Sequence, residues 1–152
     1  MSQENIERMR QASRTEPTWQ LLGIKLEEIA DGYSKVSLKT KPEFLNFIGT
    51  VHGGIIVTLA DSAFGYALNS LHFPTVASQF NIHFLNPTNA GDELVAECRV
   101  VKAGKRTVMA EIRVETRDGK LIAKATGVGV PLEKDNRWFA VRPYGHDIIA
   151  YA

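Results

Sequence analysis

The sequence predicts an α+β fold in which a curved antiparallel sheet wraps around one long central helix. Residues 52–71 have helical length and are apolar around most of their circumference. Before them lies one hairpin of alternating polar and apolar residues, and after them come four more alternating runs joined by turn sequences. Strands joined by tight turns form an antiparallel sheet, and the helix is the apolar element available to cover its inner face.

The central helix carries an isolated acid. Residues 44–91 contain one formally charged side chain, Asp61, where average usage would give roughly 12. At 100° per residue, the non-apolar positions of the helix form one narrow strip, consisting of Gly54, Thr58, Asp61, Ser62, Gly65 and Asn69. A carboxylate that loses water here needs partners or a function, so Asp61 is the first candidate. The alternative is an Asp that bonds nearby backbone or lies at a wet edge.

The other elements follow in chain order. A short amphipathic helix after Ser2 is expected to end or turn at Pro17, and residues 24–39 form the hairpin. Residues 41–51 are expected to be a loop that leads to the central helix, and Pro74 interrupts the chain after it. The later strands are expected at 76–84, 94–100, 108–114 and 121–130. In the first of these, Val76, Ser78, Phe80, Ile82 and Phe84 share one face.

Length and composition indicate one domain. The 152 residues are 44% hydrophobic with a net charge of +1, so residues 1–22 are interpreted as a lead-in and residues 131–152 as a C-terminal tail. The charge balance gives no electrostatic reason to expect nucleic acid as a partner. A single Cys98 excludes an internal disulfide, and no metal motif is present. The charged N-terminus and the lack of a membrane-spanning apolar run predict a cytoplasmic protein without a membrane partner.

The start of the central helix, His52-Gly53-Gly54, has the features that an oxyanion site requires. The first N–H groups of a helix have no intrahelical acceptor, and glycines let a ligand oxygen approach them closely. The alternative is that the two glycines only permit a tight turn. Asp61 lies eight residues after Gly53, about 12 Å along the axis, so one helix does not bring both to one carbonyl group. Two antiparallel helices would, which predicts a two-fold dimer with shared sites.

Several motifs together resemble the hot-dog-fold thioesterases of the PaaI type, from phenylacetate degradation. They are Asn46-Phe47-Ile48-Gly49-Thr50-Val51-His52-Gly53-Gly54, Leu59-Ala60-Asp61, and Phe80-Asn81-Ile82-His83-Phe84-Leu85-Asn86-Pro87. The resemblance spans roughly residues 17–130. It implies a homodimer, often paired into a homotetramer, that hydrolyses acyl-CoA thioesters, with coenzyme A as part of the substrate and no separate cofactor.

The resemblance also implies roles for individual residues. Asp61 would be the general base for water or the nucleophile, and the Gly53 N–H, with Gly54, would bind the oxyanion. Asn46 would hold the attacking water or the Asp61 carboxylate. His52 would orient the loop or bond the thioester oxygen, unless it is simply a helix-entry histidine bonded to backbone.

Further positions are expected to bind substrate. Gly65 leaves room beside Asp61 for an acyl pocket, and the residues expected to line that pocket are Phe64, Leu68 and, near the acyl group, Ser78. The turn Lys102-Ala103-Gly104-Lys105-Arg106 offers three cations, from Lys102, Lys105 and Arg106, and a Gly104 backbone N–H for the phosphates of CoA, although solvated surface turns often look the same.

Two other functions remain open at this stage. A hot-dog acyl-CoA hydratase or dehydratase would bind similar thioesters and would need His52 as a partner of the acid. A non-catalytic acyl-CoA-binding protein would use the same pocket. The acyl group itself, whether aromatic, short or medium in chain length, is not identified by the sequence.

Overall fold

The computed structural model describes residues 2–133, which form two short helices, a long helix and six strands. The expected tail of residues 131–152 therefore lies almost entirely outside the described residues. The elements are α1 Ser2–Ser13, α2 Pro17–Leu22, β1 Lys25–Ala30, β2 Tyr33–Lys39, the 3₁₀ turn η1 Pro42–Phe44, α3 Gly53–Leu71, β3 Thr75–Phe84, β4 Glu93–Ala103, β5 Val108–Thr116 and β6 Leu121–Pro131.

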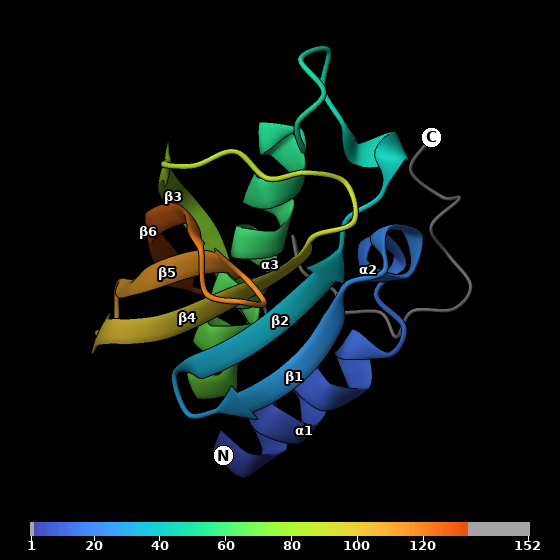
Figure 1. Cartoon of the computed structure of the whole chain (residues 1–152). Helices are drawn as coiled ribbons and strands as arrows, with labels where there is room; N and C mark the ends of the chain where they lie inside the picture. The colour runs from blue at the N-terminus through green and yellow to red at the C-terminus, as the bar shows by residue number, and fades with distance from the viewer. Residues whose placement is uncertain (1, 134–152) are drawn as a thin grey trace, which may run out of the picture.

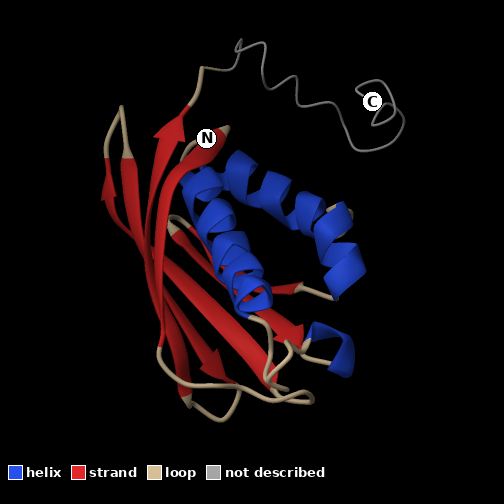
Figure 2. Ribbon diagram, turned by 90° about the horizontal axis from the view of Figure 1, so that it is seen from above, coloured by secondary structure: helices blue, strands red, loops and turns tan. Residues whose placement is uncertain are grey.

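The six strands form one antiparallel sheet in the order β1-β2-β4-β5-β6-β3. The sheet curves around α3, and the helices lie on its inner side (Figures 1 and 2). This arrangement confirms the predicted α+β architecture. It leaves β1 and β3 as the two edges of the sheet.

The long helix packs against the sheet as its sequence pattern predicts. Its inward residues, among them Leu59, Ala63 and Phe64, are fully buried. All six residues of the predicted strip keep some exposure, and Asp61 is one of the two most open. Gly127 in β6 allows the close fit, because a β-carbon there would lie 2.7 Å from the Phe64 ring. One strip of α3 therefore remains available at the surface.

The N-terminal segment differs from the expectation at Pro17. The first helix ends at Ser13, and Pro17 then begins α2 instead of only ending a helix. Proline suits the first helical position because its missing N–H would have no acceptor there. The helix ends at Gly23, whose φ of +84° is a conformation that favours glycine. Its Trp19 is only 1% exposed, so this short helix is part of the core.

The expected face of β3 is wrong at Ser78. A shift in register between Ala77 and Gln79 places Ser78 at a bulge, where its hydroxyl donates to the Val128 carbonyl at 3.1 Å. The bulge breaks the alternation that the sequence pattern assumed. Phe80 and Ile82 still pack against the core, whereas Phe84 is 53% exposed.

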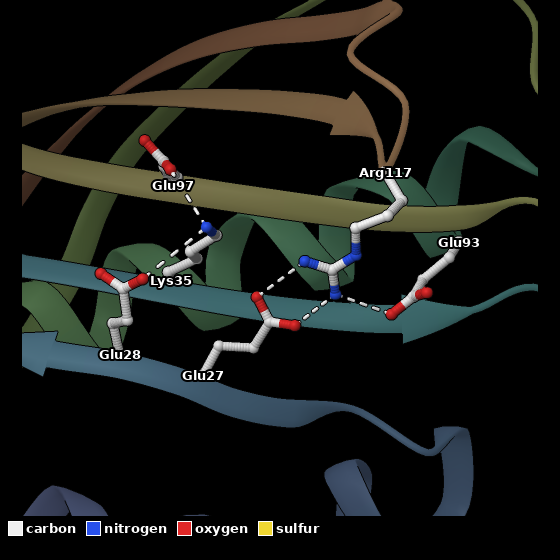
Figure 3. Close-up of polar contacts among 6 residues, drawn as sticks. All are labelled: Glu27, Glu28, Lys35, Glu93, Glu97 and Arg117. Carbon is white, nitrogen blue, oxygen red and sulfur yellow. Dashed lines mark hydrogen bonds and ion pairs between the residues drawn. The ribbon is translucent and has the colours of Figure 1, made fainter.

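The outer face of the sheet is polar, as predicted. Lys35 lies between Glu28 and Glu97, at 3.7 and 3.8 Å, and Arg117 bridges Glu27 and Glu93 (Figure 3). Such exposed pairs contribute little stability individually, so they chiefly mark the face that meets solvent.

Two further expectations concern Cys98 and membranes. Cys98 is fully buried on the inner face, and burial raises the pKa of its thiol to about 12, as expected of a small core side chain. No helix within residues 2–133 is both long and apolar enough to span a membrane.

Candidate active site at the central helix

His52 caps the start of α3. Its backbone is extended, and its Nδ1 accepts a hydrogen bond of 2.9 Å from the Gly54 N–H. Its carbonyl accepts further bonds from the N–H groups of Ile55, at 2.9 Å, and Ile56, at 3.4 Å. These contacts give His52 the backbone-bonded position that the sequence left as one alternative.

The Gly53 N–H is the open donor of the first helical turn. Of the four N–H groups at the start of a helix, those of Gly54, Ile55 and Ile56 bond His52. None of the hydrogen bonds among residues 2–133 uses the Gly53 N–H. Gly54 was expected to help bind an oxyanion, but in the structure its N–H is already bonded. A ligand oxygen at this helix end would therefore meet Gly53.

Asn46 shapes the loop that leads into α3. Its side-chain oxygen accepts from the N–H groups of Ile48, at 3.0 Å, and Thr50, at 3.2 Å, and its amide donates to the Thr50 hydroxyl at 3.0 Å. One amide hydrogen of Asn46 remains for a further acceptor. The loop also presents Phe47, which is 98% exposed, and Ile48, which is 72% exposed.

A cavity of about 290 Å³ opens beside the helix entrance. Ten residues line it: Asn46, Thr50, Val51, Gly53, Ile56, Phe84, Leu85, Asn86, Pro87 and Thr88. Phe84 lies directly over Gly53, since a β-carbon there would be 3.3 Å from the end of its ring. Asn46 and Gly53 thus line one hollow that both polar and apolar side chains form.

Asp61 lies on the open strip of α3. Its side chain is exposed in the single chain, and no group among the described residues donates a hydrogen bond to its carboxylate. Surrounding protein atoms still displace enough water to raise the pKa of Asp61 above its ordinary value of 3.8. A carboxylate with a raised pKa and no donor is a better base than an ordinary surface Asp.

Asp61 and Gly53 do not meet within one chain. They belong to the same helix, eight residues apart, which is about 12 Å along the axis. An oxyanion donor and an attacking group must both lie about 3 Å from the reacting carbonyl. The structure therefore groups Asn46, His52, Gly53 and Gly54 at one place and Asp61 at another.

The expected acyl-pocket residues have different positions. Phe64 packs edge-on against Phe80 at 5.6 Å, and Leu68 is 1% exposed and packs toward Gly129, so both face their own sheet. Gly65 lies on the open strip, and a β-carbon there would meet no neighbouring group within 4 Å, which leaves free space one turn after Asp61. Ser78 is on the edge strand and bonds Val128.

The cationic turn between β4 and β5 lies at the opposite end of α3 from Gly53 (Figure 1). Val100 near the end of β4 donates to the carbonyl of Gly32, and Gly32 adjoins Leu71, the last residue of α3. Lys102, Lys105 and Arg106 are exposed. The Gly104 N–H, expected to be free for a phosphate, instead bonds the Thr107 carbonyl at 2.9 Å.

Comparison with known proteins decides the family. A model described as Thioesterase superfamily matches residues 48–123. The acyl-coenzyme A thioesterase PaaI of Escherichia coli K12 is 37% identical over 106 residues, which are 70% of this chain and 76% of that protein. The chain belongs to the thioesterase superfamily. The matched region includes the helix entrance, Asp61 and residues 84–88, which line the cavity.

Solved structures of thioesterase-superfamily proteins agree with this fold. The structure of E. coli PaaI has a TM-score of 0.79 at 31% identity, covering 87% of this chain and 94% of that one. A hypothetical thioesterase from Streptococcus pneumoniae TIGR4, crystallised with coenzyme A, has a TM-score of 0.68 at 28% identity, covering 70% and 84%. The sheet wrapped around α3 is thus the hot-dog fold, and the chain is a thioester hydrolase of the acyl-CoA thioesterase class.

Sequence reasoning missed two groups of residues around this candidate site. Phe84 to Thr88 line the cavity because β3 ends beside the helix entrance; the uncharged run before Gly91 was the available signal. Glu16 and Trp19 lie against α3 because a second short helix forms after Pro17. The Pro17 and Gly23 pair, a start and a stop signal six residues apart, could have revealed it.

Proposed function

We propose that this thioesterase hydrolyses a small aromatic or a short- to medium-chain acyl-CoA in a site shared between two copies of the chain. Asp61 of one copy acts on the thioester carbon, either by activating water or as the nucleophile. The Gly53 N–H of the other copy holds the developing oxyanion. The observation that carries this proposal is the separation, along one helix, of an N–H and a carboxylate that have no hydrogen-bond partner among residues 2–133.

A two-fold pairing of α3 helices resolves that separation. If two copies of α3 run antiparallel with their open strips together, Asp61 of each chain comes beside the entrance of its partner. The exposed side chains of Phe47 and Ile48 next to the entrance give such a pairing apolar surface to bury. A homodimer, which in turn pairs into a homotetramer, is the assembly that we propose.

The same pairing accounts for the position of the cations. Lys102, Lys105 and Arg106 lie at the end of α3 that is far from Gly53 in their own chain. Antiparallel helices bring that end toward the entrance of the second copy. The phosphates of CoA would then lie near this turn while the thioester reaches Gly53.

The chemistry divides between the two chains. Attack at the thioester carbon moves the carbonyl electrons onto oxygen, where the Gly53 N–H and the positive end of the α3 dipole stabilise the charge. The electrons then return and the carbon–sulfur bond breaks. If Asp61 activates water, its carboxylate takes the water proton and passes it to the leaving thiolate, which gives the CoA thiol and the acid. If Asp61 is the nucleophile, the thiolate takes a proton from solvent, and a water molecule then hydrolyses the acyl-Asp61 anhydride to release the acid. The spare amide hydrogen of Asn46 supports a role in holding the attacking water.

The direct test is thiol release from a panel of acyl-CoA esters by wild type and Asp61→Asn. Asn has nearly the shape of Asp but is not a base, so kcat should fall by about two or more orders of magnitude with a melting temperature no lower than that of wild type. Incubation with an enoyl-CoA in parallel detects hydration. A wild-type rate for Asp61→Asn, or hydration without thiol release, would overturn the proposal.

A further inference from the structure

The cavity beside the helix entrance is lined by uncharged side chains. None of its ten lining residues is Asp, Glu, Lys, Arg or His. Two of its polar side chains already bond the protein, since the Asn86 amide donates to the Leu121 carbonyl at 2.8 Å and the Thr88 hydroxyl donates to the Asp92 carboxylate at 3.0 Å. A charge without a partner is costly to enclose. The cavity therefore suits the uncharged acyl part of a thioester better than the phosphates of CoA.

Phe84 borders this cavity directly beside Gly53. Three atoms at the end of its ring lie 3.3, 3.4 and 3.8 Å from the place that a β-carbon on Gly53 would occupy. Gly53 also carries the N–H that is left without an acceptor among residues 2–133. A carbonyl oxygen bonded to that N–H lies about 2.9 Å from its nitrogen. The first carbons of a bound acyl group therefore start next to the Phe84 ring.

The backbone around Phe84 is held in place. Phe84 pairs with Ala123 at the end of the ladder between β3 and β6, and the N–H of Leu85 donates to the Ile122 carbonyl at 2.8 Å. The ring itself is exposed, whereas Phe80 on the same strand packs against the core. A side chain that adds little to the core, on a backbone that is held, is available to contact a ligand.

We propose that Phe84 determines acyl specificity, because its ring limits the space beside Gly53 and disfavours acyl groups that branch at the carbon next to the thioester carbonyl. This proposal rests on the proposed function, since it takes the Gly53 N–H as the oxyanion donor. A straight chain places one narrow methylene beside the ring, whereas a branch places a second carbon there. Packed side chains make room for an added carbon only at a cost.

The test compares two acyl-CoA esters of equal composition, hexanoyl-CoA and 2-ethylbutanoyl-CoA. The full chain is assayed for thiol release, and kcat/KM is measured for each ester. Wild type should prefer hexanoyl-CoA by about tenfold or more. Phe84→Ala removes the ring and should reduce that preference to about threefold or less, chiefly through a higher kcat/KM for the branched ester.

Phe84→Leu is the second variant. It keeps an apolar side chain but removes the ring, so its preference should lie between those of wild type and Phe84→Ala, and it decides the matter if Phe84→Ala does not fold. Met109→Ala serves as the matched control. Met109 is an exposed apolar residue of β5 that does not line the cavity, so its loss should leave the preference unchanged.

Two results would overturn the inference. If Phe84 only covers the helix entrance, its variants will slow both esters by the same factor and keep the wild-type preference. Equal kcat/KM values of wild type for the two esters would show that the ring excludes no branch.

The outcome separates this inference from the proposed function. If Asp61→Asn is inactive and the Phe84 variants keep the wild-type preference, only the role of Phe84 fails. If Asp61→Asn keeps the wild-type rate, the proposed function fails first.

Discussion

The two ends of the open strip on α3 are built in opposite ways. At the helix entrance, His52 and Asn46 bond the neighbouring N–H groups, and the Gly53 N–H is left over a cavity. Further along, no residue between 2 and 133 donates a hydrogen bond to Asp61, and a β-carbon at nearby Gly65 would meet none of these residues within 4 Å. One region offers an oxyanion donor without an acid, and the other an acid without a donor. In the proposed dimer, each region meets its complement on the other chain.

The largest expected effect comes from removing the Gly53 N–H. Gly53→Pro removes the N–H at the first helical position, which proline tolerates, and the extended backbone of His52 suits a following proline. We expect kcat to fall about 10²- to 10³-fold, as for loss of one oxyanion donor.

Gly53→Ala is the control for that measurement. Alanine keeps the N–H but places the same β-carbon 3.3 Å from Phe84. It should lose far less activity than Gly53→Pro. Equal losses would show that the space beside Phe84 matters, and not the donor.

A smaller effect is expected at His52. His52→Ala removes the acceptor of the Gly54 N–H and should lower the free energy of unfolding by about 1 kcal/mol, measured by denaturant titration. His52→Asn keeps a capping acceptor and should retain that stability. If His52→Asn also keeps the wild-type kcat, the histidine only caps the helix; a slow but stable variant would indicate contact with the thioester oxygen. Wild-type stability of His52→Ala would contradict the capping role.

The smallest effect concerns stability and pH at Asp61. Because folding raises the pKa of this acid, the unfolded chain releases the proton first, and the contribution of Asp61 to stability falls as pH rises. Asp61→Asn should therefore melt slightly above wild type at neutral pH. The difference should vanish once the pH falls below 3.8, the ordinary value for Asp. A variant that melts below wild type at neutral pH would contradict this account.

Hydrophobic periodicity was enough to predict most of the fold. The apolar circumference of residues 52–71 predicted a helix enclosed by the sheet, and the open strip with Asp61 matches the exposed side of α3. These features depend on local repeats of 3.6 and 2 residues, which a single sequence displays directly. The distance between the entrance glycines and Asp61 was likewise predictable, because the number of residues between them fixes a length along the helix.

Features that depend on contacts between distant segments were not predictable in this way. The bulge at Ser78 is set by pairing of β3 with β6. The hydrogen bond between Glu16 and Tyr66 joins residues 50 positions apart, so no local sequence pattern predicts it. For the same reason, the inward direction of Phe64 needed the three-dimensional fit against Gly127.

Mixing two inactive variants tests the shared site most directly. Chains carrying Asp61→Asn and chains carrying Gly53→Pro are unfolded together, refolded and assayed for thiol release, with each variant refolded alone as the control. In a mixed dimer, the intact Asp61 of one chain faces the intact Gly53 of the other. The account predicts recovery of about a quarter of wild-type activity, because half of random dimers are mixed and each has one working site of two. No recovery in mixtures whose dimers have exchanged subunits would contradict a site shared between chains.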